Sequence, residues 1–166
     1  MDSLAEDLIE YKKQLKTGKI NRAYKGLMEY ILSLRTHLKN KYPDYCGSGN
    51  LYQGYMDMTY FSFFPKTIEV RDLKIAIVFL HAPFRFEVWL AGRNKQIQTK
   101  YWNIFSENKW NLYNIVATTK GADSIIEFVL VDNPDFSDLI ALTSQIENKI
   151  LKFINDIDNF LSALST

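Results

Sequence analysis

A chain of 166 residues, 47% of them apolar and 23% charged, has the size and composition of one globular domain, which we expect to span residues 1–166. Its longest apolar run, Ile75–Leu80, is far shorter than the roughly 20 residues that cross a bilayer, so no membrane span is expected. The net charge of +1 excludes a strongly basic protein, and the single cysteine, Cys46, excludes an internal disulfide.

The start of the chain and its cysteine content point to a compartment. An acidic opening (Asp2, Glu6 and Asp7) differs from a signal peptide, in which basic residues precede an apolar run. A single cysteine is compatible with a reducing environment. We therefore expect a cytoplasmic protein that has no membrane partner.

Charge is distributed unevenly along the chain. Residues 11–41 carry nine Lys or Arg and one acidic residue, whereas residues 122–166 carry eight acidic residues and two lysines. The basic block could attract nucleic acid or another polyanion, or basic and acidic helices could lie near each other in one fold. Both interpretations stay open, as does the absence of any role, although we do not expect nucleic acid as the main partner.

The first 41 residues predict two helices joined as a helical hairpin. Ser3 and Glu6 form a capping-box pattern, and Gly18 marks the end of the first helix. Asn21 can cap a second helix that ends before Pro43. Apolar residues at helical spacing are Leu4, Leu8, Tyr11 and Leu15 in the first helix, and Tyr24, Leu27, Ile31, Leu34 and Leu38 in the second.

Residues 52–91 predict three strands. After a loop at residues 42–50, Tyr52 to Tyr60 alternate in a way that suits a sheet with one buried face, and Pro65 ends this strand. Residues 73–80 and 85–91 alternate again around a turn at Pro83. If Leu80 lies opposite Arg85, then Ile75, Ile77 and Phe79 meet Leu90, Val88 and Phe86. A slip of one residue would bury Arg85 and Glu87, so this register should be strongly specified.

The rest of the chain predicts a middle helix, one or two strands and a long last helix. Gly92 releases the chain from the sheet, and a helical stripe begins at Ile97. A short strand is expected within residues 110–116, a buried strand at 124–131, and a helix of more than 20 residues from Leu139. We therefore expect an α+β fold, with an antiparallel sheet of four or five strands packed with the helical hairpin, the middle helix and the long C-terminal helix.

No pattern of metal-site or cofactor chemistry is present. His37, His81 and Cys46 lie far apart and lack the paired spacing of zinc ligands. The segment CGSGN at residues 46–50 lacks the lysine and the strand–helix context of a phosphate loop. The Glu-x-Lys pattern of restriction-type nucleases also fails, because the second residue after Glu87 is a tryptophan. We expect no metal and no cofactor.

Polar residues gather on the second face of the predicted sheet. There Asp57 and Thr59 would share the surface with Arg85, Glu87 and Trp89. Two carboxyl groups near an arginine on an apolar floor could form an acid–base pair, because burial and like charge separate their pKa values. They could equally form a cross-strand ion pair or line a ligand pocket.

The turn AGRNK at residues 91–95 leads from a strand into a helix. Its amides and the charges of Arg93 and Lys95 could hold an anion. The alternative is a glycine that the bend requires, followed by two solvated cations.

Four segments, YKKQLKTGKINRAYKGLMEYILSLRTHLKNKYPDY, LYQGYMDMTYFSF, LKIAIVFLHAPFRFEVWLAGRNKQIQTKYW and SIIEFVLVDNPDFSDL, together resemble a family of small bacterial proteins known only as a domain of unknown function. The resemblance covers nearly the whole chain. It implies a bacterial, cytoplasmic, single-domain protein and implies no activity or functional residue.

The leading hypothesis is a non-catalytic domain that binds a small ligand or a protein with one sheet face. The candidate residues are Tyr55, Asp57, Arg85, Glu87, Trp89 and Arg93. One alternative is a hydrolase-like enzyme that uses Asp57 and Glu87. Another is polyanion binding through the basic helices of residues 11–41. The sequence leaves homodimer formation open.

Overall fold

The computed structural model describes residues 3–47 and 49–164, which form an α+β fold. The chain divides into two compact units, Met1–Thr36 (unit 1) and His37–Thr166 (unit 2). The described elements are α1 (Leu4–Leu15), α2 (Lys19–Lys41), β1 (Met58–Ser62), α3 (Lys66–Glu69), β2 (Leu73–Leu80), β3 (Arg85–Gly92), α4 (Lys95–Glu107), β4 (Asn114–Ile115), β5 (Ile126–Asp132) and α5 (Leu139–Leu164). The expected fold class is confirmed. None of the described helices is both long and apolar enough to span a membrane.

Unit 1 contains α1 and α2 as far as Thr36, and the last turn of α2 belongs to unit 2. The capping box is present, with Ser3 N–H donating to Glu6 Oε2 at 2.8 Å and Glu6 N–H donating to Ser3 Oγ at 3.3 Å. Gly18 has a φ of +68° between the helices, and α2 begins at Lys19, before the predicted cap at Asn21. No residue of α1 is buried, so the close packing expected of a helical hairpin is not observed.

Unit 2 contains a five-stranded antiparallel sheet in the order β1-β2-β3-β5-β4. The predicted register of β2 and β3 is confirmed, because Leu80 pairs with Arg85 and Ile77 pairs with Val88. Strict alternation sends Ile77 and Val88 into the core, with 1% and 0% exposure, and turns Glu87 and Trp89 to the other face.

The first strand is shorter than the sequence pattern predicted. Tyr52 and Tyr60 pair with each other, and the residues between them turn at Gly54, which has a φ of +68°. The hydroxyl of Thr59 donates to the Gln53 carbonyl at 2.8 Å and lies 2.8 Å from Nε2 of His81 on the buried side. Thr59 therefore lies on the buried face of β1, and Asp57 lies in the turn before β1. Neither residue is on the second sheet face, because the alternating sequence pattern includes residues of the turn as well as of the strand.

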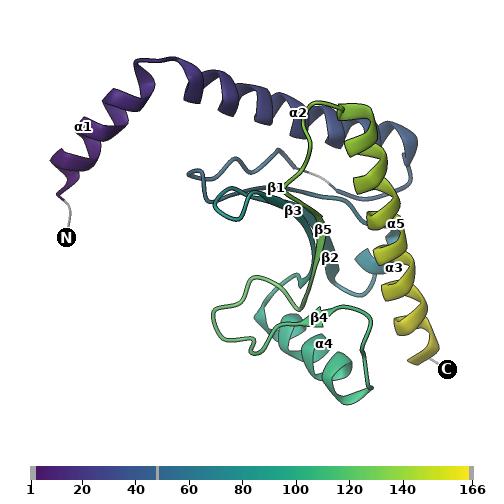
Figure 1. Ribbon diagram of the computed structural model, residues 1–166. Helices are drawn as coiled ribbons and strands as arrows, with labels where there is room; N and C mark the ends of the chain where they lie inside the picture. Colours follow the sequence, from purple (N-terminus) through teal and green to yellow (C-terminus); the bar gives the residue numbers. More distant parts are fainter. Residues whose placement is uncertain (1–2, 48, 165–166) are drawn as a thin grey trace. The chain divides into compact units, whose positions relative to one another are not determined.

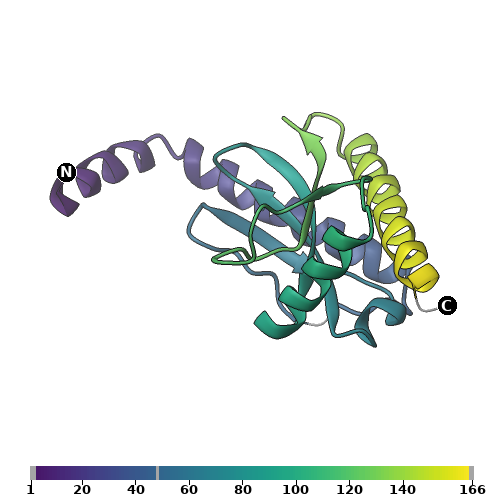
Figure 2. The same cartoon turned by 90° about the horizontal axis from the view of Figure 1, so that it is seen from below.

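Helix α5 lies along one side of the sheet in Figures 1 and 2. The ring of Phe153 of α5 stacks on that of Phe128 of β5 at 6.5 Å between centroids. The side chain of Lys149 donates to the Leu130 carbonyl at 2.6 Å, next to the irregularity between β3 and β5. Helix α4 lies at the end of the sheet (Figure 1), and Phe105 of α4 stacks on Phe160 of α5. Among the described residues of unit 2, no helix covers the opposite face, which we call the open face.

Candidate functional site

Side chains of the three strands β1, β2 and β3 form the centre of the open face. Because residues two apart in a strand share a face, the paired registers define its rows. Each row crosses the strands: the first contains Tyr60, Val78 and Glu87, the second contains Ser62, Ala76 and Trp89, and the third contains Lys74 and Ala91. Large and small side chains alternate on this surface, which decides where it is hollow.

Glu87 is buried on this face, with 3% exposure, and it accepts hydrogen bonds from both sides along its own strand. Arg85 donates to Oε1 from Nε at 2.8 Å and pairs with the same oxygen through a terminal nitrogen at 2.7 Å. The indole N–H of Trp89 donates to Oε2 at 2.6 Å. The carboxylate is thus fully engaged by residues two positions before and after it.

This network fixes the orientation of the Trp89 ring. A buried carboxylate is costly unless it is paired and hydrogen-bonded, and Glu87 meets that condition only when the indole N–H points toward it. The ring of Trp89 is therefore held in one position. Glu87 itself is covered and does not present a free carboxylate.

A hollow of about 180 Å³ lies beside the fixed Trp89 ring. Its floor is made of the small residues Ser62, Ala76 and Ala91, which leave space next to the large rings of Trp89 and Tyr60. Tyr60 is supported from behind, because its ring stacks on that of Tyr52 at 4.8 Å between centroids. The hollow therefore has a floor of small side chains and two positioned aromatic rings.

A larger cleft, of about 550 Å³, lies at the start of α4. It is lined by Lys74 of β2, Lys95 of α4 and Lys120 of the loop before β5. The strand and the helix approach closely here, because a Cβ on Gly92 would lie 2.5 Å from the backbone nitrogen of Gln98. The side-chain carbonyl of Gln98 also accepts from the Gly92 N–H at 2.6 Å, which fixes the first turn of α4 against the sheet.

The lysines of this cleft make it electropositive. Within residues 3–47 and 49–164, no ion pair involves Lys74, Lys95 or Lys120. The first turn of α4 adds the positive end of the helix dipole, and the cleft contains one carboxylate, that of Asp123. Its charges favour an anion.

The hollow and the cleft adjoin each other, because Lys74 and Asp123 line both. Together they extend from the aromatic side chains of the open face to the lysines at the start of α4, and we call the two together the open-face groove. One part is lined by two aromatic rings and small side chains, the other part is cationic, and Lys74 and Asp123 lie where the two parts adjoin.

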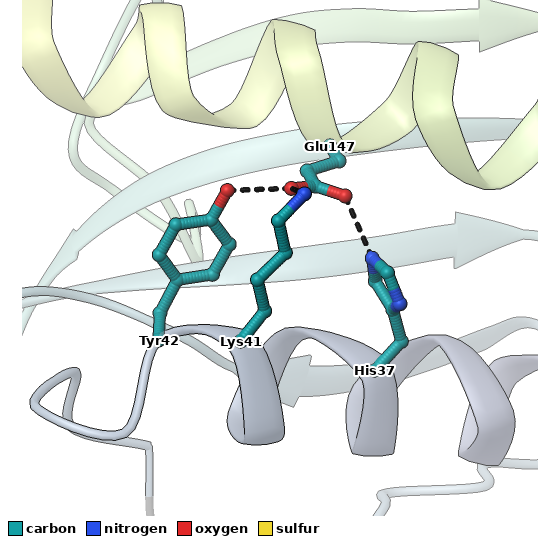
Figure 3. A network of polar contacts seen from close by, with 4 residues as sticks. All are labelled: His37, Lys41, Tyr42 and Glu147. Carbon is teal, nitrogen blue, oxygen red and sulfur yellow. Dashed lines mark hydrogen bonds and ion pairs between the residues drawn. The ribbon is translucent and has the colours of Figure 1, made fainter.

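A second buried glutamate, Glu147, lies on the helical side of unit 2 (Figure 3). It extends from α5 toward the C-terminal end of α2, where Lys41 and His37 contact its two oxygens, each at 2.7 Å. The hydroxyl of Tyr42 donates to Oε1 at 2.5 Å. The cluster joins two segments that are 105 to 110 residues apart in the sequence.

The partners of Glu147 hold it in the ionised form. Burial alone would raise its pKa, but the hydrogen bonds from Lys41, Tyr42 and His37 outweigh burial and lower the pKa to about 2. The hydrogen bond to Glu147, together with burial, raises the pKa of Tyr42 to about 12. With all its partners in place, the cluster acts as a link between α2 and α5.

Comparison with known proteins gives one match. The family model of the Domain of unknown function (DUF7000) matches residues 4–161. The chain belongs to this family. The resemblance to a domain of unknown function is therefore confirmed over nearly the whole chain, whereas its bacterial origin stays a prediction. No curated protein and no solved structure matches the chain.

The structure of this DUF7000 member brings together some of the predicted site residues. Arg85, Glu87 and Trp89 form one network on the open face. Tyr55 is 93% exposed in the turn before β1, away from the groove. Arg93 forms an ion pair with Asp72 at 3.3 Å and does not line the cleft, whereas Lys95 does.

Asp57 and Glu87 do not form the acid–base pair that the hydrolase hypothesis requires. The carboxylate of Asp57 accepts from the Tyr55 N–H at 2.9 Å within its own turn, and hydrogen bonds from the Tyr55 and Met58 N–H groups lower its pKa. Glu87 is enclosed by Arg85 and Trp89. The ion pair that was expected between two strands instead joins Arg85 and Glu87, which belong to the same strand.

Sequence reasoning missed several residues of the groove. The sequence pattern placed Tyr60 on the opposite face of the sheet and assigned no face to Ser62, because the register of β1 depends on where the turn ends. Lys120 and Asp123 lie in a loop that has no periodic pattern. The signal that could have revealed the hollow is the pair of alanines, Ala76 and Ala91, opposite and beside Trp89 in the predicted register.

Proposed function

We propose that this DUF7000 domain binds a small organic anion in the open-face groove. The observation that carries the proposal is the Trp89 ring, which the buried Glu87 holds beside a hollow that continues into a lysine-lined cleft. Ligand sites are usually concave, partly apolar and equipped with a few well-placed polar groups. The open-face groove has each of these properties.

The buried charge of Glu87 supports a role in preorganisation. Placing a carboxylate in a sheet face costs desolvation energy that a well-packed apolar side chain would avoid. Here the carboxylate restricts the rotation of Trp89, and a ring that is already ordered loses less entropy when a ligand binds. The burial of Glu87 is therefore explained better by the ordering of Trp89 for binding than by a gain in stability.

The three lysines support an anionic ligand. Like charges that converge on one cleft repel each other, and an anion removes this repulsion. The cleft volume of about 550 Å³ falls in the usual range of small-molecule sites, roughly 300–1,000 Å³. The concave shape favours a small ligand over the alternative of a protein partner or a second copy of the chain.

We further propose a cytoplasmic location. The single cysteine supports it, because a low cysteine content suits a reducing compartment.

A ligand screen with two proteins tests the proposal. Thermal unfolding of the wild type and of Trp89→Ala is followed in a library of small organic acids, amines and neutral metabolites at millimolar concentration. We expect acids, and not amines, to raise the midpoint of the wild type, because a ligand that binds only the folded state stabilises it. Trp89→Ala should lose this response. Equal responses of both proteins, or a response to amines alone, would refute the proposal.

A further inference from the structure

We infer that the anion is a nucleoside phosphate, whose base lies against Trp89 and Tyr60 while its phosphate lies among Lys74, Lys95 and Lys120. This inference rests on the proposed function and specifies its ligand class. It follows from the order of chemical groups along the open-face groove: two aromatic rings at the hollow, Lys74 and Asp123 where the hollow and the cleft adjoin, and Lys95 and Lys120 in the cleft.

The aromatic end suits one planar ring system. The hollow of about 180 Å³ is smaller than a typical complete ligand site, so it accommodates one part of a ligand and not the whole of it. Its large side chains are the rings of Trp89 and Tyr60, both held in place by neighbours. Nucleobases stack on such rings because every base has a π-face.

The cationic end suits phosphate. Lysine is a compact point charge and a common phosphate ligand, and three lysines from three separate elements line the cleft. The positive end of the α4 dipole adds to their field. A phosphate group carries more charge than a single carboxylate, which matches three ammonium groups better.

The carboxylate of Asp123 lies where a sugar would connect the two ends. Lys74 and Asp123 line both the hollow and the cleft, so any ligand that occupies both parts passes them. A carboxylate repels phosphate but accepts hydrogen bonds from the hydroxyl groups of ribose, as acidic residues do in dinucleotide-binding folds. Asp123 therefore suits the middle of a nucleoside phosphate.

The same features argue against a polymer. Single-stranded nucleic acid binds along extended grooves in which successive bases stack on successive aromatic rings. The open-face groove has one aromatic hollow, bordered on its far side by Met58 and Val78. One aromatic hollow accommodates one base, which favours a single nucleotide over a polymer.

Calorimetric titration of the full chain with AMP, GMP, CMP and UMP tests the inference. The corresponding nucleosides and inorganic phosphate are titrated under the same conditions. We expect at least one monophosphate to bind with a dissociation constant below about 1 mM, which corresponds to roughly 4 kcal/mol of binding. Its nucleoside and inorganic phosphate should each bind at least tenfold more weakly, because each occupies only one end of the groove.

Variants show which end holds which part. Lys95→Ala with Lys120→Ala should weaken the monophosphate at least tenfold and leave the nucleoside unaffected, whereas Lys100→Ala, an exposed lysine of α4 outside the cleft, should have no effect. Trp89→Ala should weaken both compounds, with Tyr11→Ala of α1 as the exposed aromatic control. Ala76→Leu fills the floor of the hollow and should block the base if Trp89→Ala does not fold.

Two results would overturn the inference. If inorganic phosphate binds as tightly as every monophosphate, and the double lysine variant abolishes both, the groove is an anion site without a base subsite and only the proposed function stands. If none of the four monophosphates binds although an organic acid stabilises the wild type through Trp89, the nucleotide class is wrong and the proposed function again stands.

Discussion

Two buried glutamates lie on opposite sides of the sheet of unit 2 and differ in what surrounds them. Glu87 accepts from Arg85 and Trp89, which belong to its own strand. Glu147 accepts from Lys41, Tyr42 and His37, which come from a distant part of the sequence. One carboxylate orients a ring beside a hollow, and the other joins two helices.

The comparison distinguishes Glu87, which orients a side chain on the open face, from Glu147, which stabilises the tertiary structure. The partners of Glu87 would lie near it in any state in which β3 is extended, so the network adds little long-range stability. The partners of Glu147 approach it only when α2 and α5 are packed, so the same chemistry stabilises the tertiary structure. Substitution of the two residues should therefore give different phenotypes.

The largest expected effect is on stability. Glu147→Ala removes three hydrogen bonds, two of them from charged or chargeable groups, and should lower the free energy of unfolding by about 2–3 kcal/mol. Urea denaturation measures the change. Glu29→Ala is the control, because its i,i+4 pair with Lys25 is exposed and should contribute less than about 0.5 kcal/mol. A loss of stability no greater than that of the control would contradict the assigned role.

The contribution of Glu147 should also depend on pH. Its pKa is about 2 in the folded protein, against an ordinary value of 4.5, so the unfolded chain binds more protons between these values. The stabilisation should be complete above about pH 5 and should disappear as the pH falls from 4.5 to 2. The difference in urea midpoint between the wild type and Glu147→Gln should shrink across this window.

The control for this pH dependence is internal. Other carboxyl groups with a lowered pKa, such as Asp156, titrate in both proteins and cancel in the difference. A difference that stays constant from pH 6 to pH 2 would show that Glu147 does not act through its charge.

A smaller effect is expected for the other glutamate. Glu87→Gln keeps the size of the side chain but weakens its hydrogen bonds, and should cost about 1 kcal/mol. It should change the near-ultraviolet circular dichroism, because the Trp89 ring loses its fixed position, whereas Glu147→Gln should leave the tryptophan signal as it is. If both variants alter that signal equally, the two clusters do not have separate roles.

The smallest effect is expected at Tyr55. Its side chain is 93% exposed, so Tyr55→Ala should change the free energy of unfolding by less than about 0.5 kcal/mol. It should also leave ligand binding unchanged, although the sequence pattern had placed Tyr55 at the site. Loss of binding in this variant would restore the sequence-based assignment and extend the groove into the turn before β1.

The sheet face around β3 could be predicted because its contacts are local. Residues two apart in a strand share a face by geometry, so Arg85, Glu87 and Trp89 had to lie together once β3 was recognised. The register with β2 followed from placing the apolar set in the core, although Glu87 is also buried, on the open face. The hollow beside Trp89 follows from the same register and the two alanines within it.

The turn before β1 could not be predicted from alternation alone. The pattern from Tyr52 to Tyr60 fits a continuous strand, but Gly54 and Met56 adopt positive φ values and reverse the chain. A glycine within a strand-like pattern was the available warning. Asp57 was therefore assigned to a face that it does not share.

The cationic end of the groove and the Glu147 cluster depend on tertiary packing. Lys120 and Asp123 belong to a loop whose path is set by β4 and β5, and no sequence period describes it. Glu147 is one of three acidic residues on α5, and nothing near it in the sequence indicates Lys41 or Tyr42. Contacts between segments a hundred residues apart are decided by the fold as a whole.

The most direct test of the open-face groove is the indole N–H resonance of Trp89 in a ¹H–¹⁵N NMR spectrum, assigned with Trp89→Phe. During titration with the tightest-binding monophosphate, this resonance at the aromatic end of the groove should shift in step with the backbone amides of Lys95 and Gly121 at its cationic end. A titration in which the Trp89 indole stays fixed, while shifts appear only on α1 and α2, would contradict the account.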